Sequence, residues 1–157
     1  MDTSSLIAAL SFLAALLAAL YARWVWSEAR RTNLLALHTN RVEVFRAFHR
    51  LRQSVQARGV EIEHELVGQF YQFSRESKFY FSEAKTSELL AKYFVACFEL
   101  AEMSRKLKRS GLAETEREHL HLQQDAMSEL EQSLFSETEK QLERELCHAV
   151  RRGWLGA

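Results

Sequence analysis

Proline is absent from the 157 residues of this chain, and glycine occurs only five times. At average usage, about 5% proline and 7% glycine, a chain of this length would hold several of each, and both residues interrupt helices. Their scarcity predicts an all-α protein. The only two cysteines, Cys97 and Cys147, lack the CxxC spacing of metal and redox motifs. We therefore expect free thiols and no structural disulfide.

Motifs of common catalytic sites are also missing. The sequence has no glycine-rich phosphate loop, no HExxH and no GxSxG. Cys147 and His148 are adjacent, so on a helix they would point about 100° apart, which is unsuitable for a nucleophile and its base. The 21 basic residues equal the 21 acidic ones, which leaves no surplus of positive charge for nucleic acid. We expect no catalytic site, no cofactor and no nucleic-acid partner.

The clearest positive feature is an apolar stretch near the N-terminus. Residues 6–22 carry no charged side chain, and Arg23 is the only charge up to Trp26. As a helix, residues 6–26 would rise about 31 Å, which matches a bilayer core of roughly 30 Å. This predicts a membrane-spanning helix after a short N-terminal segment, residues 1–5. A cleaved secretory signal is the alternative, but residues 1–5 lack the basic region that such signals need.

The residues around this stretch predict its orientation. Tyrosine and tryptophan favour the lipid headgroup level, and arginine resists translocation across the membrane. Both kinds of residue gather at the C-terminal end of the stretch, whereas residues 1–5 carry only Asp2 as a charge. Residues 27–157 should therefore form a cytoplasmic domain of a single-pass protein. The expected membrane-interface residues are Tyr21, Arg23, Trp24, Trp26, Arg30 and Arg31.

Small residues recur at every fourth position within the stretch, a spacing that lets two helices approach closely. Alanine is common throughout this segment, so the same spacing also arises without any self-association. The positions of possible span self-association are Ser11, Ala15 and Ala19, together with Ala14, Ala18 and Ala22.

Beyond the stretch, apolar residues recur at intervals of three and four, which is typical of amphipathic helices. The segments 42–55, 62–73, 89–107 and 120–150 show this spacing. The first could continue the membrane helix without a break, or a fresh helix could begin at Thr32 or Thr39. The pattern predicts an antiparallel bundle of three or four helices.

Local signals suggest where these helices begin. Ser82 or Thr86 should cap the third segment, and Thr115 with Glu118 forms a capping box for the last. A second capping-box pattern at residues 136–139 predicts a break or kink there.

Residues 75–81 show no helical period, so we expect them to form a connector that places aromatic rings in the core. The phenylalanines expected in the core or in an interface are Phe45, Phe48, Phe70, Phe79 and Phe81.

Charge is unevenly distributed along the chain. Residues 23–58 hold eight arginines against two glutamates, whereas residues 111–157 hold ten acids against five bases. The basic segment could meet anionic lipid or the acidic last helix. We favour the acidic helix for residues 41–58, because that segment also has an apolar stripe that must pack against something.

The pattern Glu-x-x-His occurs four times, a spacing used by carboxylate-bridged metal sites in helical bundles. Such ligands must project into the bundle, and no second pair of inward glutamates is evident. We therefore expect no metal, and the low-ranking candidate ligands are Glu116, His119, Glu145 and His148.

Two short stretches, residues 41–48 and 77–81, resemble small uncharacterised bacterial proteins with one N-terminal span and a cytoplasmic helical domain. The resemblance implies a bacterial inner-membrane protein and brings no known substrate, cofactor or catalytic residue. Together with the orientation argued above, it places residues 1–5 in the periplasm. The leading hypothesis is a membrane-anchored, non-enzymatic interaction or accessory module that binds another protein or itself. The alternatives are a self-oligomerising membrane-active effector or regulator, and a metal protein.

Overall fold

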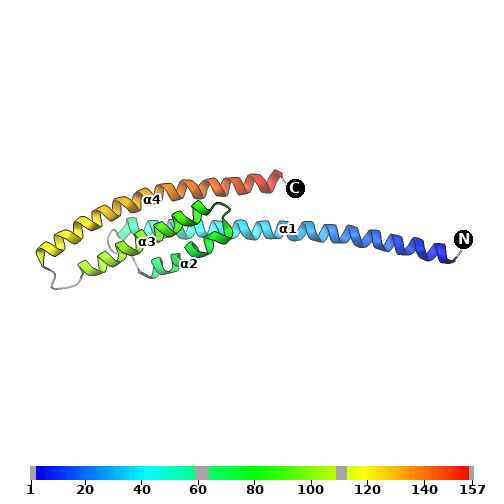
Figure 1. Cartoon of the computed structure of the whole chain (residues 1–157), viewed down its shortest axis with the longest axis horizontal. Helices are drawn as coiled ribbons and strands as arrows, with labels where there is room; N and C mark the ends of the chain where they lie inside the picture. The colour runs from blue at the N-terminus through cyan, green and yellow to red at the C-terminus, as the bar shows by residue number, and fades with distance from the viewer. Residues whose placement is uncertain (1–2, 59–63, 109–112, 156–157) are drawn as a thin grey trace. The chain divides into compact units, whose positions relative to one another are not determined.

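The computed structural model describes residues 3–58, 64–108 and 113–155. These residues form four helices and no strand: α1 (Thr3–Arg58), α2 (His64–Tyr80), α3 (Ala84–Leu107) and α4 (Glu114–Leu155), as Figure 1 shows. The all-α prediction is confirmed. Gly59 and Ser110-Gly111, which follow the first and third of the apolar segments in the sequence, lie outside the described residues.

α1 is continuous through residues 32–40, so no fresh helix begins at Thr32 or Thr39. The chain divides into two compact units within this helix, residues 1–37 and residues 38–157. In the first unit, the most apolar window of α1 has a mean hydropathy of 2.2, and none of it is buried. α1 is thus long and apolar enough to cross a membrane.

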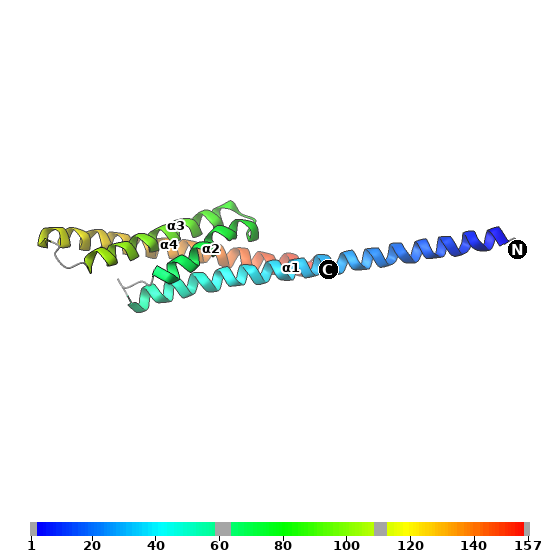
Figure 2. The ribbon, with the colours of Figure 1, turned by 90° about the horizontal axis from the view of Figure 1, so that it is seen from below.

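The second unit is built around α3, which packs against both α2 and α4. Figures 1 and 2 both show the end of α1 beside these helices within this unit. All four helices contribute to one apolar core. Its buried members are Val44, Phe48, Leu51, Val67, Phe70, Phe81, Leu90, Tyr93, Cys97, Leu100, Ala101 and Leu142.

The prediction of a connector at residues 75–81 is wrong, because α2 continues to Tyr80. Phe70, Ser74 and Ser77 are buried at helical spacing, so small serines continue the inward face where no apolar residue marks it. The Ser77 hydroxyl donates to the Ser74 carbonyl, 2.6 Å away, which satisfies it inside the core. Phe81 completes this face just after the helix ends.

The expected caps also differ from the structure. α3 begins after Glu83 as its N-cap, without a side-chain cap bond, and Thr86 is buried within the helix. Thr115 lies inside α4, which begins at Glu114. α4 also runs unbroken through residues 136–139, because Thr138 points inward and is fully buried. Side chains that pack between helices have overridden the local capping pattern.

Candidate functional site

The inward face of α4 carries polar residues at intervals of seven. Gln124, Glu131, Thr138 and Glu145 are 4%, 1%, 0% and 3% exposed. Seven residues are two helical turns, so these side chains form one line along the helix. We call this line the polar seam. Burying a polar group is costly unless it is hydrogen-bonded, so the partners of these side chains indicate what the seam does.

At the centre of the seam, Glu131 joins three helices. Its Oε2 accepts a hydrogen bond from the Arg52 guanidinium of α1, which forms an ion pair with it. Its Oε1 accepts a hydrogen bond from the Tyr93 hydroxyl of α3, at 2.7 Å. The Arg52 side chain is 13% exposed and that of Glu131 is 2% exposed. One buried carboxylate therefore ties α1 and α3 to α4.

Aromatic rings pack against this cluster. The Phe48 ring stacks on Phe135 with centroids 4.9 Å apart and an interplanar angle of 6°. Phe48 also contacts the Tyr93 ring, with centroids 4.8 Å apart. The Arg52 guanidinium lies over Phe135, 4.8 Å from the ring centroid. This cation–π contact adds to the ion pair in holding Arg52.

Burial alters the acid–base behaviour of two groups beside Glu131. Burial raises the pKa of the Tyr93 hydroxyl well above its usual range, with smaller contributions from Cys97 and Glu131. Burial also raises the pKa of the Cys97 thiol to about 12, and the negative charge of Glu131 adds to the effect. Both groups are therefore protonated at neutral pH, and Cys97 is packed as a small apolar residue.

At the end of the seam, Glu145 receives hydrogen bonds from the turn before α3. Its Oε1 accepts from the backbone N–H of Glu83 at 2.9 Å, and its Oε2 accepts from the Ser82 hydroxyl at 3.1 Å. The Gln141 amide donates to Glu83 at 2.5 Å and to Thr86 at 3.3 Å. α4 thus supplies the polar contacts at the beginning of α3 that a local capping residue would otherwise make.

The metal-ligand candidates are not brought together. Glu116, His119 and His148 are exposed, and Glu145 is buried with partners from the α2–α3 turn. Among the described residues, no group of three His, Cys, Asp or Glu side chains is placed to hold a metal ion.

The expected pairing of the basic segment with the acidic helix is found at Arg52, which pairs with Glu131. Arg41 differs, because its Nε donates to the Tyr80 carbonyl at 2.6 Å and its guanidinium lies over the Phe81 ring. It ties α1 to the end of α2 instead.

The predicted membrane-interface residues all lie on α1 with exposed side chains, as do the small residues of the stretch. The Arg30 guanidinium lies 5.8 Å from the Trp26 ring centroid, and the Tyr21 and Trp24 rings are 6.1 Å apart. Arg31 pairs with Glu28 at 3.8 Å on the helix surface. Their roles at a membrane remain predictions.

The five singled-out phenylalanines separate by burial. Phe48 is 0% exposed, Phe70 is 2% and Phe81 is 7%, and Phe45 packs partly buried against the same core. Phe79 is 72% exposed and lies outside the core, so only the interface role remains open to it.

A row of aromatic rings crosses the surface from α2 to α3. Tyr71 and Phe94 have ring centroids 5.1 Å apart, and Phe94 and Phe98 are 6.0 Å apart. The His64 ring extends the row, 6.3 Å from Phe98. Tyr71 is 43% exposed and Phe98 44%. We call these four residues the aromatic row. Exposed apolar patches of this kind are typical of contact surfaces.

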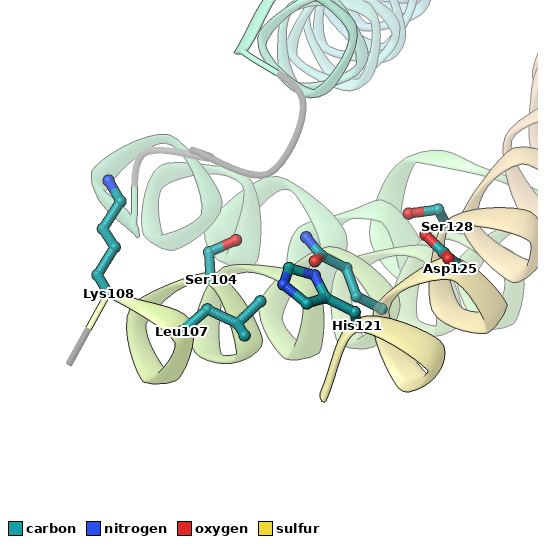
Figure 3. A pocket seen from close by; sticks show the side chains of 7 residues that line it. Ser104, Leu107, Lys108, His121, Asp125 and Ser128 are labelled. Carbon is teal, nitrogen blue, oxygen red and sulfur yellow. The ribbon is translucent and has the colours of Figure 1, made fainter. Parts of the chain in front are cut away.

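A groove opens where the end of α3 meets the beginning of α4 (Figure 3). Its volume is about 450 Å³. Gln124, the first member of the polar seam, lies in its wall. The residues that line the groove are Ser104, Leu107, Lys108, His121, Gln124, Asp125 and Ser128.

Sequence reasoning missed the polar seam because it looked for apolar spacing alone. A signal was present, since Gln124, Glu131 and Thr138 recur every seven residues, as Met127 and Leu134 do. Two parallel series on one helix, one polar and one apolar, indicate that both lie near the buried face.

These features define an all-α protein with one candidate membrane-spanning helix and a helical unit that buries a polar seam. Neither a family model, nor a curated protein, nor a solved structure matches this chain.

Proposed function

We propose that this protein is a membrane-anchored, non-enzymatic helical interaction or accessory module of a bacterial inner-membrane assembly. In this proposal residues 6–26 cross the membrane, residues 1–5 lie in the periplasm, and residues 27–157 form an antiparallel helical bundle in the cytoplasm. Its partners are the lipid bilayer and another protein.

The observation that carries the proposal is the exposure of the apolar stretch of α1. Leu10, Phe12 and Leu17 are 64%, 70% and 58% exposed, and no other described segment covers them. Each buried apolar side chain of this size gains about 1.5–3 kcal/mol relative to water, so the stretch requires an apolar environment. A bilayer supplies it over the length of the helix.

The arrangement of polar groups supports an interaction role for the second unit. Glu131 and Glu145 accept hydrogen bonds from neighbouring helices and turns, so these carboxylates serve to hold helices together. The aromatic row, in contrast, presents Tyr71 and Phe98 outward. Aromatic residues are enriched in protein interfaces, which makes this row the face that we expect a partner protein to cover.

The orientation is tested with the native cysteines. Cys147 is exposed near the end of α4, whereas Cys97 is buried. A membrane-impermeant maleimide should label Cys147 in lysed cells and leave it unlabelled in intact spheroplasts. The Cys147→Ser variant should lose the label, which assigns it to that residue. Labelling of Cys147 in intact spheroplasts would contradict a cytoplasmic domain.

The partner is tested by purifying the tagged full-length protein from native membranes in mild detergent, with mass spectrometry of stoichiometric companions. A single companion protein is expected. Phe98→Ser should release it, whereas Leu122→Ser should retain it, because Leu122 is 70% exposed on α4, away from the aromatic row. Recovery of the chain alone as a monomer would contradict the proposal, and recovery as a homo-oligomer would favour a self-assembling effector.

A further inference from the structure

The outer side of α2 ends in an exposed phenylalanine that two basic residues accompany. Phe79 is 72% exposed, the highest value among the aromatic side chains described in residues 38–157. Arg75 and Lys78 are exposed as well. All three lie on one side of the helix, because residues three and four apart are neighbours there. The Lys78 ammonium lies 5.0 Å from the centroid of the Phe79 ring. We call these three residues the α2 patch.

The side chains around the α2 patch leave its charge positive. Among the described residues, no carboxylate forms an ion pair with Arg75 or Lys78. The Arg75 Nη1 donates a hydrogen bond to the Tyr71 hydroxyl at 3.3 Å, and a guanidinium carries further N–H donors. The acidic neighbour is Glu76, which is turned about 100° from Arg75 around the helix. Its carboxylate accepts a hydrogen bond from the Tyr80 hydroxyl at 3.1 Å. The patch therefore presents two cations beside an apolar ring.

The α2 patch lies where the chain enters the second unit. That unit begins at His38, and the Arg41 Nε donates at 2.6 Å to the carbonyl of Tyr80, the residue after Phe79. Arg41 follows Trp26, the end of the proposed membrane span, by fifteen positions. Fifteen residues extend about 22 Å as a helix and at most about 54 Å in any conformation. The anchor therefore keeps the patch within reach of the bilayer surface.

Lipid suits this patch better than a protein partner does. At a membrane interface an aromatic ring reaches the boundary of the acyl chains, and a neighbouring cation meets the lipid phosphates. One ring and two cations make a surface far smaller than a specific protein interface, which takes about 20–30 residues a side. A tethered contact needs no such area, because the anchor supplies a high local concentration of lipid.

We propose that the α2 patch rests on the anionic lipid surface beside the membrane anchor. Phe79 enters the boundary between headgroups and acyl chains, and Arg75 and Lys78 bind the lipid phosphates. This inference rests on the proposed function, because an unanchored protein would not hold so small a patch at a membrane. It adds a second membrane contact, formed by the helical unit itself, and so determines which side of that unit faces the bilayer.

The test places the photoreactive residue p-benzoylphenylalanine at position 79 of the full-length protein. The protein is reconstituted in nanodiscs of phosphatidylcholine and the anionic lipid phosphatidylglycerol, irradiated briefly and analysed by mass spectrometry. A covalent lipid adduct is expected at position 79. The same residue at position 122 is the matched control, because Leu122 of α4 is 70% exposed and lies outside the patch. As much lipid adduct at position 122 as at position 79 would overturn the proposal.

Changes of charge test the two basic residues. A basic residue near an anionic membrane favours binding about fivefold, so Arg75→Gln and Lys78→Gln should each lower the adduct yield by about that factor. Nanodiscs of phosphatidylcholine alone should lower it about 25-fold. Lys106→Gln should leave it unaltered, because Lys106 is exposed in the last turn of α3, beyond Glu102, which contacts His64 at the other end of α2. Yields that do not depend on these charges would contradict the proposal. Circular dichroism confirms that each variant is folded.

A third position separates this inference from the anchor on which it rests. Leu17 lies in the proposed span, so the photoreactive residue placed there should form a lipid adduct in both kinds of nanodisc. An adduct at position 17 without one at position 79 would overturn the α2 patch and leave the anchor intact. No adduct at either position would overturn both. In native membranes, a protein adduct at position 79 in place of a lipid adduct would assign the patch to a partner protein and overturn the proposal.

Discussion

Removal of Arg52 gives the most direct test of how the second unit is held together. Glu131 is buried. It forms an ion pair with Arg52 of α1 and accepts a hydrogen bond from Tyr93 of α3. In an Arg52→Met variant the long apolar part of the side chain is retained and the charge is lost. A buried carboxylate deprived of its cation costs about 3–5 kcal/mol. We expect the free energy of unfolding to fall by about this amount.

The measurement is chemical denaturation of the full-length protein in lipid nanodiscs, followed by circular dichroism of its helices. Arg50→Met is the matched control. Arg50 lies two positions earlier on α1 with an exposed side chain, so its loss should alter stability by no more than about 0.5 kcal/mol.

A second substitution separates a buried unpaired charge from general damage. The double variant Arg52→Met/Glu131→Met removes both charges, and it should recover most of the loss because an apolar pair packs well in place of a buried ion pair. About 1–3 kcal/mol should remain lost, because Tyr93 then lacks its acceptor. Adding Tyr93→Phe should restore that remainder. A loss below about 1 kcal/mol for Arg52→Met, or a double variant no more stable than the single one, would refute this reasoning.

Three further changes test other parts of the structure. Gly68→Ala should raise stability by about 0.5–1 kcal/mol in the same denaturation assay, because alanine favours helices and an added Cβ meets nothing within 4 Å; destabilisation would contradict an open helical position. Glu145→Ala should lower stability by about 1–2 kcal/mol, since the N–H of Glu83 loses its acceptor; hydrogen exchange at Glu83 should then accelerate. At pH 8 iodoacetamide should modify Cys147 and spare Cys97 in the folded protein, because the buried thiol has a pKa of about 12 and stays protonated until the pH approaches that value; equal modification would contradict its burial.

The sequence predicted the helices well where apolar residues mark the inward face. Phe48 and Leu51 on α1, and Tyr93 and Leu100 on α3, recur at helical spacing and are all buried. The spacing works because these side chains gain free energy only when their helix turns them away from water.

The same reasoning failed where small or polar side chains fill the inward face. Ser74 and Ser77 continue the buried face of α2, and without an apolar marker residues 75–80 gave no helical period. Phe79 shows the converse case, because of the two roles expected for it, core or interface, its 72% exposure on α2 leaves only the interface. Composition tells how much a residue gains from burial, but its position on the helix decides whether burial is available.

Glu145 illustrates why the polar contacts escaped prediction. Its spacing to His148 suggested a metal ligand. In the structure it accepts a hydrogen bond from the backbone N–H of Glu83, which lies 62 residues earlier and which no pattern in the sequence indicated. Contacts of this range depend on which helices become neighbours, and no local pattern contains that information. The charge imbalance between the two ends of the chain came closest, because it anticipated that the basic part of α1 would meet the acidic helix α4, as Arg52 meets Glu131.

The polar seam also explains how α3 and α4 keep one alignment. Ser82, just before α3, contacts Glu145, and Tyr93 contacts Glu131. Residue numbers therefore rise along α3 while those of the α4 partners fall, so the two helices are antiparallel. A slip of seven residues would keep the apolar faces in contact, and apolar packing alone discriminates weakly against it. The slip would move Glu131 from Tyr93 toward Leu100 or Thr86 and away from Arg52, at a cost of about 3–5 kcal/mol for the unpaired carboxylate. Buried polar groups are known to fix the register of paired helices in this way. We therefore expect the double variant Arg52→Met/Glu131→Met, although stable, to populate the slipped alignment of α3 and α4 more than the native chain does, with the contacts of Glu145 as the remaining restraint. Disulfide trapping between cysteines placed on the two helices would detect the slipped form.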